Sequence, residues 1–233
     1  MNNKLTIAVT GAAGFLGSQL VKALLQRGSL SGPQGETQEI GRLIAIDRVA
    51  FQGIDDSRLQ VLTGDNSDSE WLCSAIPAQV DSVFHLAAIV SSQAEQDFEL
   101  GMKINVDAFR QLLEHLRQLP QSVKLVTTSS VAVFGGDLPE KVSDSQVWLP
   151  QSSYGTQKAI CDLLLADYSV AVGLMAEACA CPPSSCARGG PIRRHRVLPA
   201  VLSASHLMGN PPFARSQRIP VCGCCRPVTQ LRL

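Results

Sequence analysis

The fold of this chain is decided by Thr10-Gly11-Ala12-Ala13-Gly14-Phe15-Leu16-Gly17, which directly follows the apolar run Leu5–Thr10. The run has the composition of a buried strand, and the residues from Gly14 onward have the apolar spacing of a helix. A strand, a glycine turn and a helix in this order predict a dinucleotide-binding unit. Gly11 permits a tight turn, Gly14 lets the backbone approach a pyrophosphate, and Gly17 allows the helix to pack closely on the strand.

The start of this helix and the end of the next strand predict which dinucleotide binds. The first helical turn, with Phe15 and Leu16, supplies unpaired N–H groups and the positive end of the helix dipole to a phosphate. Asp47 ends the next strand, where a carboxylate accepts hydrogen bonds from the ribose hydroxyls of NAD and repels the 2′-phosphate of NADP. NAD is therefore the expected cofactor. Arg48 softens this preference, so NADP stays the less favoured alternative.

Apolar β-type runs alternate with helical patterns through the first 170 residues, which predicts an α/β, Rossmann-type doubly wound parallel sheet. The predicted strands are Leu5–Thr10, Leu43–Ile46, Leu59–Leu62, Ser82–Leu86 and Val123–Thr127. The predicted helices are Gly14–Gln26, Asp68–Ala75, a long one within Ala94–Leu119, and Ser153–Ser169. Gly28–Gly41 is expected to be an exposed loop. Asp65 and Asn66 end the third strand, at the edge where ligands of open α/β sheets bind.

Tyr154 and Lys158 stand four residues apart on the last predicted helix and therefore project from one face. An ammonium held about 4 Å from the phenol is worth roughly 4 kcal/mol at an effective dielectric constant of about 20. That interaction lowers the tyrosine pKa toward neutrality, by up to about three units. The phenolate can then take a proton from a substrate hydroxyl as a hydride leaves for the nicotinamide. As an alternative, Lys158 is an ordinary solvated helix charge.

Together with the glycine turn, this pair resembles the extended short-chain dehydrogenase/reductases, the NAD-dependent epimerase/dehydratase type, and the resemblance runs through residues 4–169. It implies that Ser130 is the catalytic serine, with Ser129 as the competing candidate. It also implies that Asn105, the family asparagine of the long helix, belongs to the catalytic residues with Tyr154 and Lys158. Leu86, Ala87 and Ala88 correspond to the stretch that lines the cofactor, and Ser129, Tyr154 and Lys158 also touch it. His85 is expected to pack structurally rather than to bind a metal, and no metal site is predicted.

Finer features favour one branch of that family. Phe134 stands where nucleotide-sugar epimerases and dehydratases usually have tyrosine. The segments 90–98, 134–139 and 152–155 resemble D-erythronate dehydrogenases, which oxidise a four-carbon sugar acid to a 2-oxo acid. The resemblance implies a small sugar-acid substrate and, for an intact member, a homodimer. A nucleotide-sugar epimerase or dehydratase is the enzymatic alternative.

The bulk composition excludes other classes. The chain has 233 residues, 45% of them apolar, and contains no apolar run of the roughly 18 residues needed to span a membrane. Leu5–Val9 is too short for the apolar region of a signal peptide, so a cytoplasmic protein is expected. Neither a membrane nor a nucleic acid is an expected partner.

Composition changes abruptly near residue 170. Residues 1–170 carry 12 Lys+Arg against 19 Asp+Glu, a net charge of −7, whereas residues 171–233 carry 8 Arg and a single acid, a net charge of +7. Six of the 8 cysteines and 8 of the 13 prolines also lie in this second part. We therefore divide the chain into an NAD-binding domain, residues 1–170, and a tail, residues 171–233.

The tail lacks sustained apolar periodicity, and its prolines would interrupt most helices or strands. We expect the sheet to be truncated after the fifth strand and the following helix, with no recognisable fold beyond. A cysteine-rich metal module is one interpretation, but the spacing lacks paired Cys-x2-Cys motifs. A basic nucleic-acid tail is another, with a single aromatic residue and no lysine to support it. Disulfides are not expected in a cytosolic chain.

A third interpretation is that the tail is out-of-frame translation, expected to be disordered. Across residues 172–192 the shifted codons permit GLDGRSMRLPTIVVRPGRPN, whose apolar segment LPTIVV would supply a sixth strand. On this hypothesis the tail replaces that strand and the substrate lobe. The chain would then be an impaired enzyme or an inactive fragment with residual dinucleotide binding.

Overall fold

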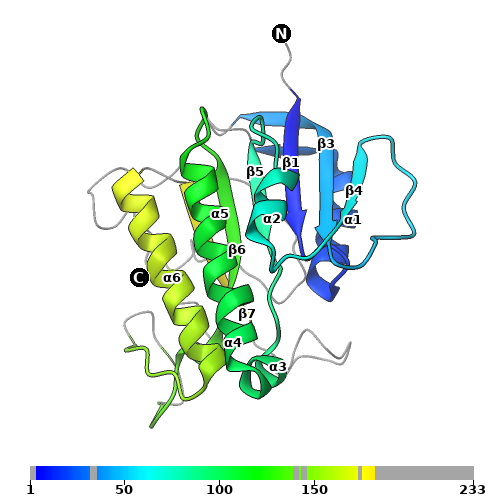
Figure 1. Ribbon diagram of the computed structural model, residues 1–233. Coiled ribbons are helices and arrows are strands. Elements are labelled where there is room, and N and C mark those ends of the chain that lie inside the picture. Colours follow the sequence, from blue (N-terminus) through cyan, green and yellow to red (C-terminus); the bar gives the residue numbers. More distant parts are fainter. Residues whose placement is uncertain (1–3, 32–35, 139–141, 143–145, 173–174, 182–233) are drawn as a thin grey trace.

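The computed structural model describes residues 4–31, 36–138, 142, 146–172 and 175–181. Its centre is a twisted sheet in the order β2-β3-β1-β5-β6-β7, with β4 paired to β3 (Figure 1). β2 pairs antiparallel with β3, and the other pairs are parallel. The strands are β1 (Leu5–Thr10), β2 (Ser29–Ser31), β3 (Thr37–Asp47), β4 (Leu59–Thr63), β5 (Ser82–His85), β6 (Lys124–Ser130) and β7 (Met175–Cys181).

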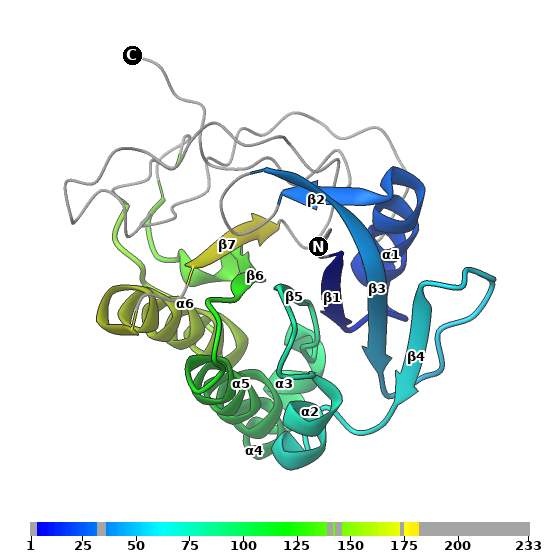
Figure 2. The ribbon, with the colours of Figure 1, turned by 90° about the horizontal axis from the view of Figure 1, so that it is seen from above.

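Helices cover both faces of this sheet, as seen from above in Figure 2. They are α1 (Phe15–Arg27), α2 (Ser69–Ala75), α3 (Ser91–Gln96), α4 (Phe98–Gly101), the π-helix η1 (Met102–Asp107), α5 (Ala108–Arg117), the 3₁₀ turn η2 (Val131–Val133) and α6 (Ser153–Val172). Apolar side chains of α1, such as Leu20 and Leu24, form one core with β1 and β3. Those of α2, α5 and α6, such as Leu72, Leu112 and Leu165, form the other core. The predicted doubly wound α/β fold is confirmed.

The segment Gly28–Gly41, predicted to be a loop, contains β2 and the first part of β3. Gly28 ends α1 with a φ of 68° and turns the chain into an antiparallel pair, in which Leu30 lies opposite Gln38. Leu30 and Ile40 are buried among the residues that pack on α1. The polar residues between them concealed the strand pattern, because one side of this short ribbon faces solvent.

The long helix predicted within Ala94–Leu119 is divided into α3, α4, η1 and α5. Asp97 interrupts it, because its carboxylate accepts a hydrogen bond from the N–H of Leu100 and caps α4. A π-helical segment follows around Asn105. The predicted apolar stripe is confirmed further on, where Phe109, Leu112, Leu113 and Leu116 are all buried.

The expectation that the sheet ends with the fifth predicted strand is wrong. β7 pairs in parallel with β6 over its full length, from Lys124 opposite Met175 to Ser130 opposite Cys181. Prolines led us to expect no strand, but the first proline of the tail is Pro182, directly after β7. A proline-free segment can pair through its backbone with the open edge of β6. The cysteine-module, basic-tail and disordered-tail interpretations concern mainly residues 182–233, which lie outside the described residues.

Within the described ranges no helix is long and apolar enough to cross a membrane. Cys73 is half-buried and Cys161 is buried, and both are free thiols.

Pairing with β7 should stabilise the domain. A chain ending at Val172 should unfold with a free energy at least about 2 kcal/mol lower than a chain ending at Cys181, because several ladder hydrogen bonds, each worth about 0.5–1.5 kcal/mol net, are lost with the burial of Ala178. Thermal and urea unfolding of the two chains side by side measure the difference. Equal stability would show that β7 contributes nothing to the sheet.

Candidate active site

The parallel strands β1, β3, β4, β5 and β6 bring their carboxyl ends to one edge of the sheet, where most of the predicted site residues lie. Thr10, at the end of β1, lies next to His85 at the end of β5, with 2.8 Å between the hydroxyl oxygen and Nδ1. The ammonium of Lys158 donates a hydrogen bond of 2.9 Å to the carbonyl of Thr128 near the end of β6. The first contact joins the ends of β1 and β5, and the second joins α6 to β6, the strand that pairs with β5.

The glycine turn is built as its sequence requires. Gly11 has a φ of 70°, and a Cβ there would come within 2.7 Å of the backbone nitrogen of Ala87. A Cβ on Gly17 would lie 2.0 Å from the carbonyl oxygen of Gly11, so only glycine lets α1 approach the turn this closely. Gly14 is the N-cap of α1, and a Cβ there would meet only the Gly11 carbonyl, at 3.2 Å. The outer side of Gly14 is therefore the part of the turn left open for a ligand.

Asp47 contacts this turn directly. One carboxylate oxygen accepts a hydrogen bond of 2.9 Å from the N–H of Ala13, and the other accepts one of 3.2 Å from Val49. The side chain is nearly buried, whereas Phe15 and Arg48 are exposed. Each Asp47 oxygen keeps a second lone pair for a hydroxyl donor. The predicted ribose-binding carboxylate thus lies beside the predicted phosphate-binding turn.

Two further groups follow β4 and β5. Asp65 is exposed and accepts a hydrogen bond from the N–H of Ser67, which holds its pKa below the usual range. Asn66 has a buried side-chain oxygen with no hydrogen-bond partner among the described residues. After β5, Leu86 and Ala87 form the backbone against which the glycine turn packs. Leu86, Ala87 and Ala88 are partly exposed, as a stretch that lines a cofactor must be.

Tyr154 and Lys158 lie together on the first turns of α6. The Lys158 ammonium is 5.9 Å from the centroid of the Tyr154 ring. Tyr154 is partly exposed, whereas Lys158 is buried, and burial lowers the pKa of its ammonium. Glu95 of α3 accepts a hydrogen bond of 2.9 Å from the N–H of Tyr154, which places a negative charge at the start of α6. This contact fixes the helix turn that carries the phenol.

The two candidate serines have different partners. Ser130 is buried, and its hydroxyl oxygen accepts a hydrogen bond of 3.1 Å from the N–H of Ala132. The Ser130 hydroxyl hydrogen stays available for a reacting oxygen. The Ser129 hydroxyl donates to Asp162 of α6. Of the two hydroxyls, that of Ser129 uses its hydrogen in a bond to α6, whereas the bond described for Ser130 uses only its oxygen.

The side chain of Asn105 is buried and bonds to two neighbouring segments. Its amide oxygen accepts a hydrogen bond of 2.9 Å from the N–H of Ile89, and its amide nitrogen donates to Gln157 at 2.8 Å. Its carbonyl accepts a hydrogen bond from the Cys161 thiol. These buried contacts tie η1 to α6 and to the segment after β5, which supports a positioning role for Asn105.

His85 packs structurally, as expected. It is buried, bonded to Thr10 and stacked on Phe109 with 5.4 Å between ring centroids. Burial, with the Lys158 charge nearby, lowers its pKa to about 3, so the ring is neutral at physiological pH. The described residues contain no group of three metal-ligating side chains.

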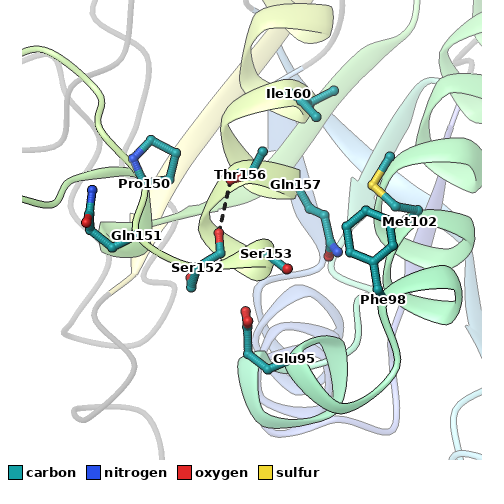
Figure 3. A pocket seen from close by; sticks show the side chains of 10 residues that line it. All are labelled: Glu95, Phe98, Met102, Pro150, Gln151, Ser152, Ser153, Thr156, Gln157 and Ile160. Carbon is teal, nitrogen blue, oxygen red and sulfur yellow. Dashed lines mark hydrogen bonds between the residues drawn. The ribbon is translucent and has the colours of Figure 1, made fainter.

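A pocket of about 560 Å³ opens beside α6, on a side away from the Tyr154–Lys158 face. Figure 3 shows Ser153, Thr156, Gln157 and Ile160 of α6 opposite Glu95, Phe98 and Met102. The α6 residues are spaced three and four apart and form one stripe, whereas Tyr154 and Lys158 belong to another. None of the predicted catalytic or cofactor residues lines this pocket.

Sequence reasoning missed Glu95, which caps α6, and Asp162, which binds Ser129. Asp162 continues the four-residue spacing of Tyr154 and Lys158 along α6, and this periodicity could have revealed it. Glu95 lies far from α6 in sequence and gave no such signal.

Comparison with known proteins agrees with this arrangement. The profile of the "NAD dependent epimerase/dehydratase family" matches residues 7–225, nearly the whole chain. The chain belongs to this family.

Two curated relatives are named D-erythronate dehydrogenase. That of Cupriavidus necator is 54% identical over 165 residues, which cover 71% of this chain and 51% of the relative. That of Haemophilus influenzae is 42% identical over 164 residues, which cover 70% and 50%. A solved nucleoside-diphosphate-sugar epimerase of Agrobacterium tumefaciens is 36% identical with a TM-score of 0.68, over 81% of this chain and 55% of that one. The chain spans about half the length of the curated relatives that it matches.

His85 should make stability depend on pH. Its pKa is about 6.5 in an unfolded chain and about 3 in the folded one, so acid protonates the unfolded state first. Its contribution is fully present above pH 6.5 and is lost as the pH falls toward 3. At pH 5 the loss should be about 2 kcal/mol. Urea unfolding of wild type and His85→Gln at pH 7.5 and pH 5 isolates the contribution of His85 to the free energy of unfolding. If the difference in stability between the two proteins were the same at both pH values, the low pKa of His85 would be contradicted.

Proposed function

We propose that this chain is the nucleotide-binding half of an NAD-dependent oxidoreductase that oxidises a hydroxyl of a small sugar acid, similar to D-erythronate, to the 2-oxo acid. The observation that carries the proposal is the Tyr154–Lys158 pair at the same sheet edge as the glycine turn. The two relatives named D-erythronate dehydrogenase support the sugar-acid substrate.

The residues at this edge fit a nicotinamide dinucleotide. Backbone atoms occupy the space where side chains of Gly11 and Gly17 would lie. The outer side of Gly14, at the start of a 13-residue helix, is open. Asp47 offers free lone pairs next to this opening, and Asn66 holds a buried oxygen that has no described partner. The pyrophosphate would lie at the α1 N-terminus, and Asp47 would hold the ribose.

When bound, the nicotinamide supplies the hydride acceptor. Tyr154 takes the hydroxyl proton of the substrate onto its phenolate oxygen, so that a C–H and an O–H bond break while a C=O bond forms. Lys158 stabilises the phenolate by its positive charge, and Ser130 donates a hydrogen bond to the reacting oxygen. Asn105 holds α6 in place through Gln157.

A nucleotide-sugar epimerase or dehydratase is the second candidate, favoured by the likeness to the Agrobacterium tumefaciens epimerase. The two reactions differ in whether NAD⁺ is consumed. The oxidoreductase converts one NAD⁺ to NADH for each substrate molecule, whereas the epimerase or dehydratase regenerates its cofactor in every turnover.

The out-of-frame origin of residues 171–233 also stays our proposal. It is supported by the abrupt change of charge, cysteine and proline content and by the strand-like segment in the shifted frame. Resequencing the gene around codon 170 tests it directly. If residues 171–233 are out of frame, this chain would retain dinucleotide binding but show little turnover.

The proposed function is tested by mixing the purified protein with NAD⁺ and D-erythronate and following NADH absorbance. NADH formation in proportion to D-erythronate consumed supports the oxidoreductase. Conversion of a nucleotide sugar without NADH accumulation would support the alternative instead. Binding of NAD⁺ with neither reaction would identify the chain as an inactive dinucleotide-binding fragment.

Replacing the predicted general base should separate catalysis from binding. In a protein whose frame is restored after codon 170, Tyr154→Phe should bind NAD⁺ normally but lose turnover by about 10²-fold or more, because the phenolate that accepts the proton is absent. Steady-state kinetics and NAD⁺ titration calorimetry measure the two effects. Turnover near that of wild type would remove Tyr154 from the mechanism.

Removing the predicted ribose carboxylate should change cofactor preference. Asp47→Ala should weaken NAD⁺ binding by about tenfold, the equivalent of one charge-assisted hydrogen bond, and NADP⁺ binding much less. Because Asp47 also accepts the Ala13 N–H, Asp47→Asn is the matched variant that retains an acceptor oxygen. Calorimetric dissociation constants for both cofactors give the result. An equal loss for NAD⁺ and NADP⁺ would exclude Asp47 from ribose recognition.

A further inference from the structure

Behind the Tyr154–Lys158 pair, Asp162 and Ser129 form a polar cluster with Lys158, and neither of these two residues has a role in the mechanism above. The cluster joins Lys158 and Asp162 of α6 to Ser129 of β6, whose hydroxyl donates to Oδ2 of Asp162. Lys158 and Asp162 are four residues apart and therefore lie on the same side of the helix, where their side chains bond to the adjacent β6 residues Thr128 and Ser129. The second carboxylate oxygen of Asp162, Oδ1, is buried and has no hydrogen-bond partner among the described residues.

The protonation of Lys158 is under opposing influences. Its ammonium is buried with a hydrogen bond to the neutral carbonyl of Thr128, and burial lowers its pKa. Burial thus favours the neutral amine. Only the charged ammonium stabilises the Tyr154 phenolate, so a negative charge near Lys158 that opposes the effect of burial would support the proposed chemistry.

Apart from the Tyr154 phenol itself, the titratable groups around Lys158 leave one described candidate for that charge. His85 of β5 is neutral at physiological pH, with a pKa of about 3. Burial raises the pKa of the Cys161 thiol on α6 to about 12, and the thiol donates to Asn105, so it is also uncharged. Burial raises the pKa of Asp162 to about 6, while Ser129 and Lys158 oppose this shift. At pH 7.5 Asp162 is therefore mostly ionised.

We propose that Asp162, oriented by the Ser129 hydroxyl, is the counter-ion that keeps Lys158 protonated in its buried position. Asp162 is thus a positioning residue that acts on Tyr154 through Lys158. Ser129 belongs to this support, which leaves Ser130 as the serine available to the substrate. The importance of the cluster for catalysis rests on the proposed function, but its effect on Lys158 does not.

The test measures the protonation of Lys158 itself. The chain has six lysines, so the carbon signals of ¹³C-labelled lysine side chains can be followed by NMR as the pH rises, with Lys158 assigned by its loss in Lys158→Arg. Asp162→Asn should increase the acid dissociation constant of Lys158 by about tenfold, one pKa unit. Ser129→Ala should shift it in the same direction by less. Asp167→Asn, exposed on the same helix, is the matched control and should leave it unchanged.

An unchanged Lys158 titration in folded Asp162→Asn would overturn the proposal. Should that variant fail to fold, Ser129→Ala decides in its place, and an unchanged titration there has the same meaning. Asp162→Glu, which retains the charge, should restore most of the Lys158 pKa. Because no turnover is needed, a protein that forms no NADH but shows these shifts would contradict the proposed function alone.

Discussion

The close contact between the glycine turn and the backbone after β5 determines the geometry of the whole sheet edge. A side chain on Gly11 would collide with Leu86 and Ala87, and one on Gly17 would collide with the turn itself. Because neither has a side chain, the turn packs directly against the segment after β5, while the parallel pairing of β1 with β5 brings Thr10 within hydrogen-bonding distance of His85. The neutral His85 ring is buried at the end of β5 and stacks on Phe109 of α5.

The second constraint is the burial of a cation. Lys158 lies between α6 and β6, and its hydrogen bond to the carbonyl of Thr128 helps to fix the position of α6 along β6. This bond, the Glu95 cap and the Asn105–Gln157 pair hold α6 at three points. The phenol of Tyr154 is therefore placed by buried contacts rather than by a surface loop, as precise proton transfer requires.

Local patterns predicted much of this arrangement. The glycine spacing, the apolar runs and the stripe of Phe109 and Leu112 depend on neighbours in sequence, and each was placed correctly. The β2–β3 ribbon was missed because its burial alternates along a polar segment and depends on contact with α1. The interruption at η1 was missed because it depends on Asn105 meeting Ile89 and Cys161, contacts between separate elements. The partners of Ser129 and Tyr154 were missed for the same reason.

The strand β7 shows how little sequence information an edge position requires. Pairing with β6 uses backbone N–H and C=O groups, which every residue except proline supplies in full. Met175–Cys181 satisfies that condition without the Val, Ile and Leu that characterise β1 or β3, and its Ala178 still becomes buried. Side-chain identity matters more beyond the strand, where a substrate lobe requires specific packing. A shift of reading frame near residue 170 could therefore preserve the sheet and the Tyr154–Lys158 geometry while removing the groups that select a substrate.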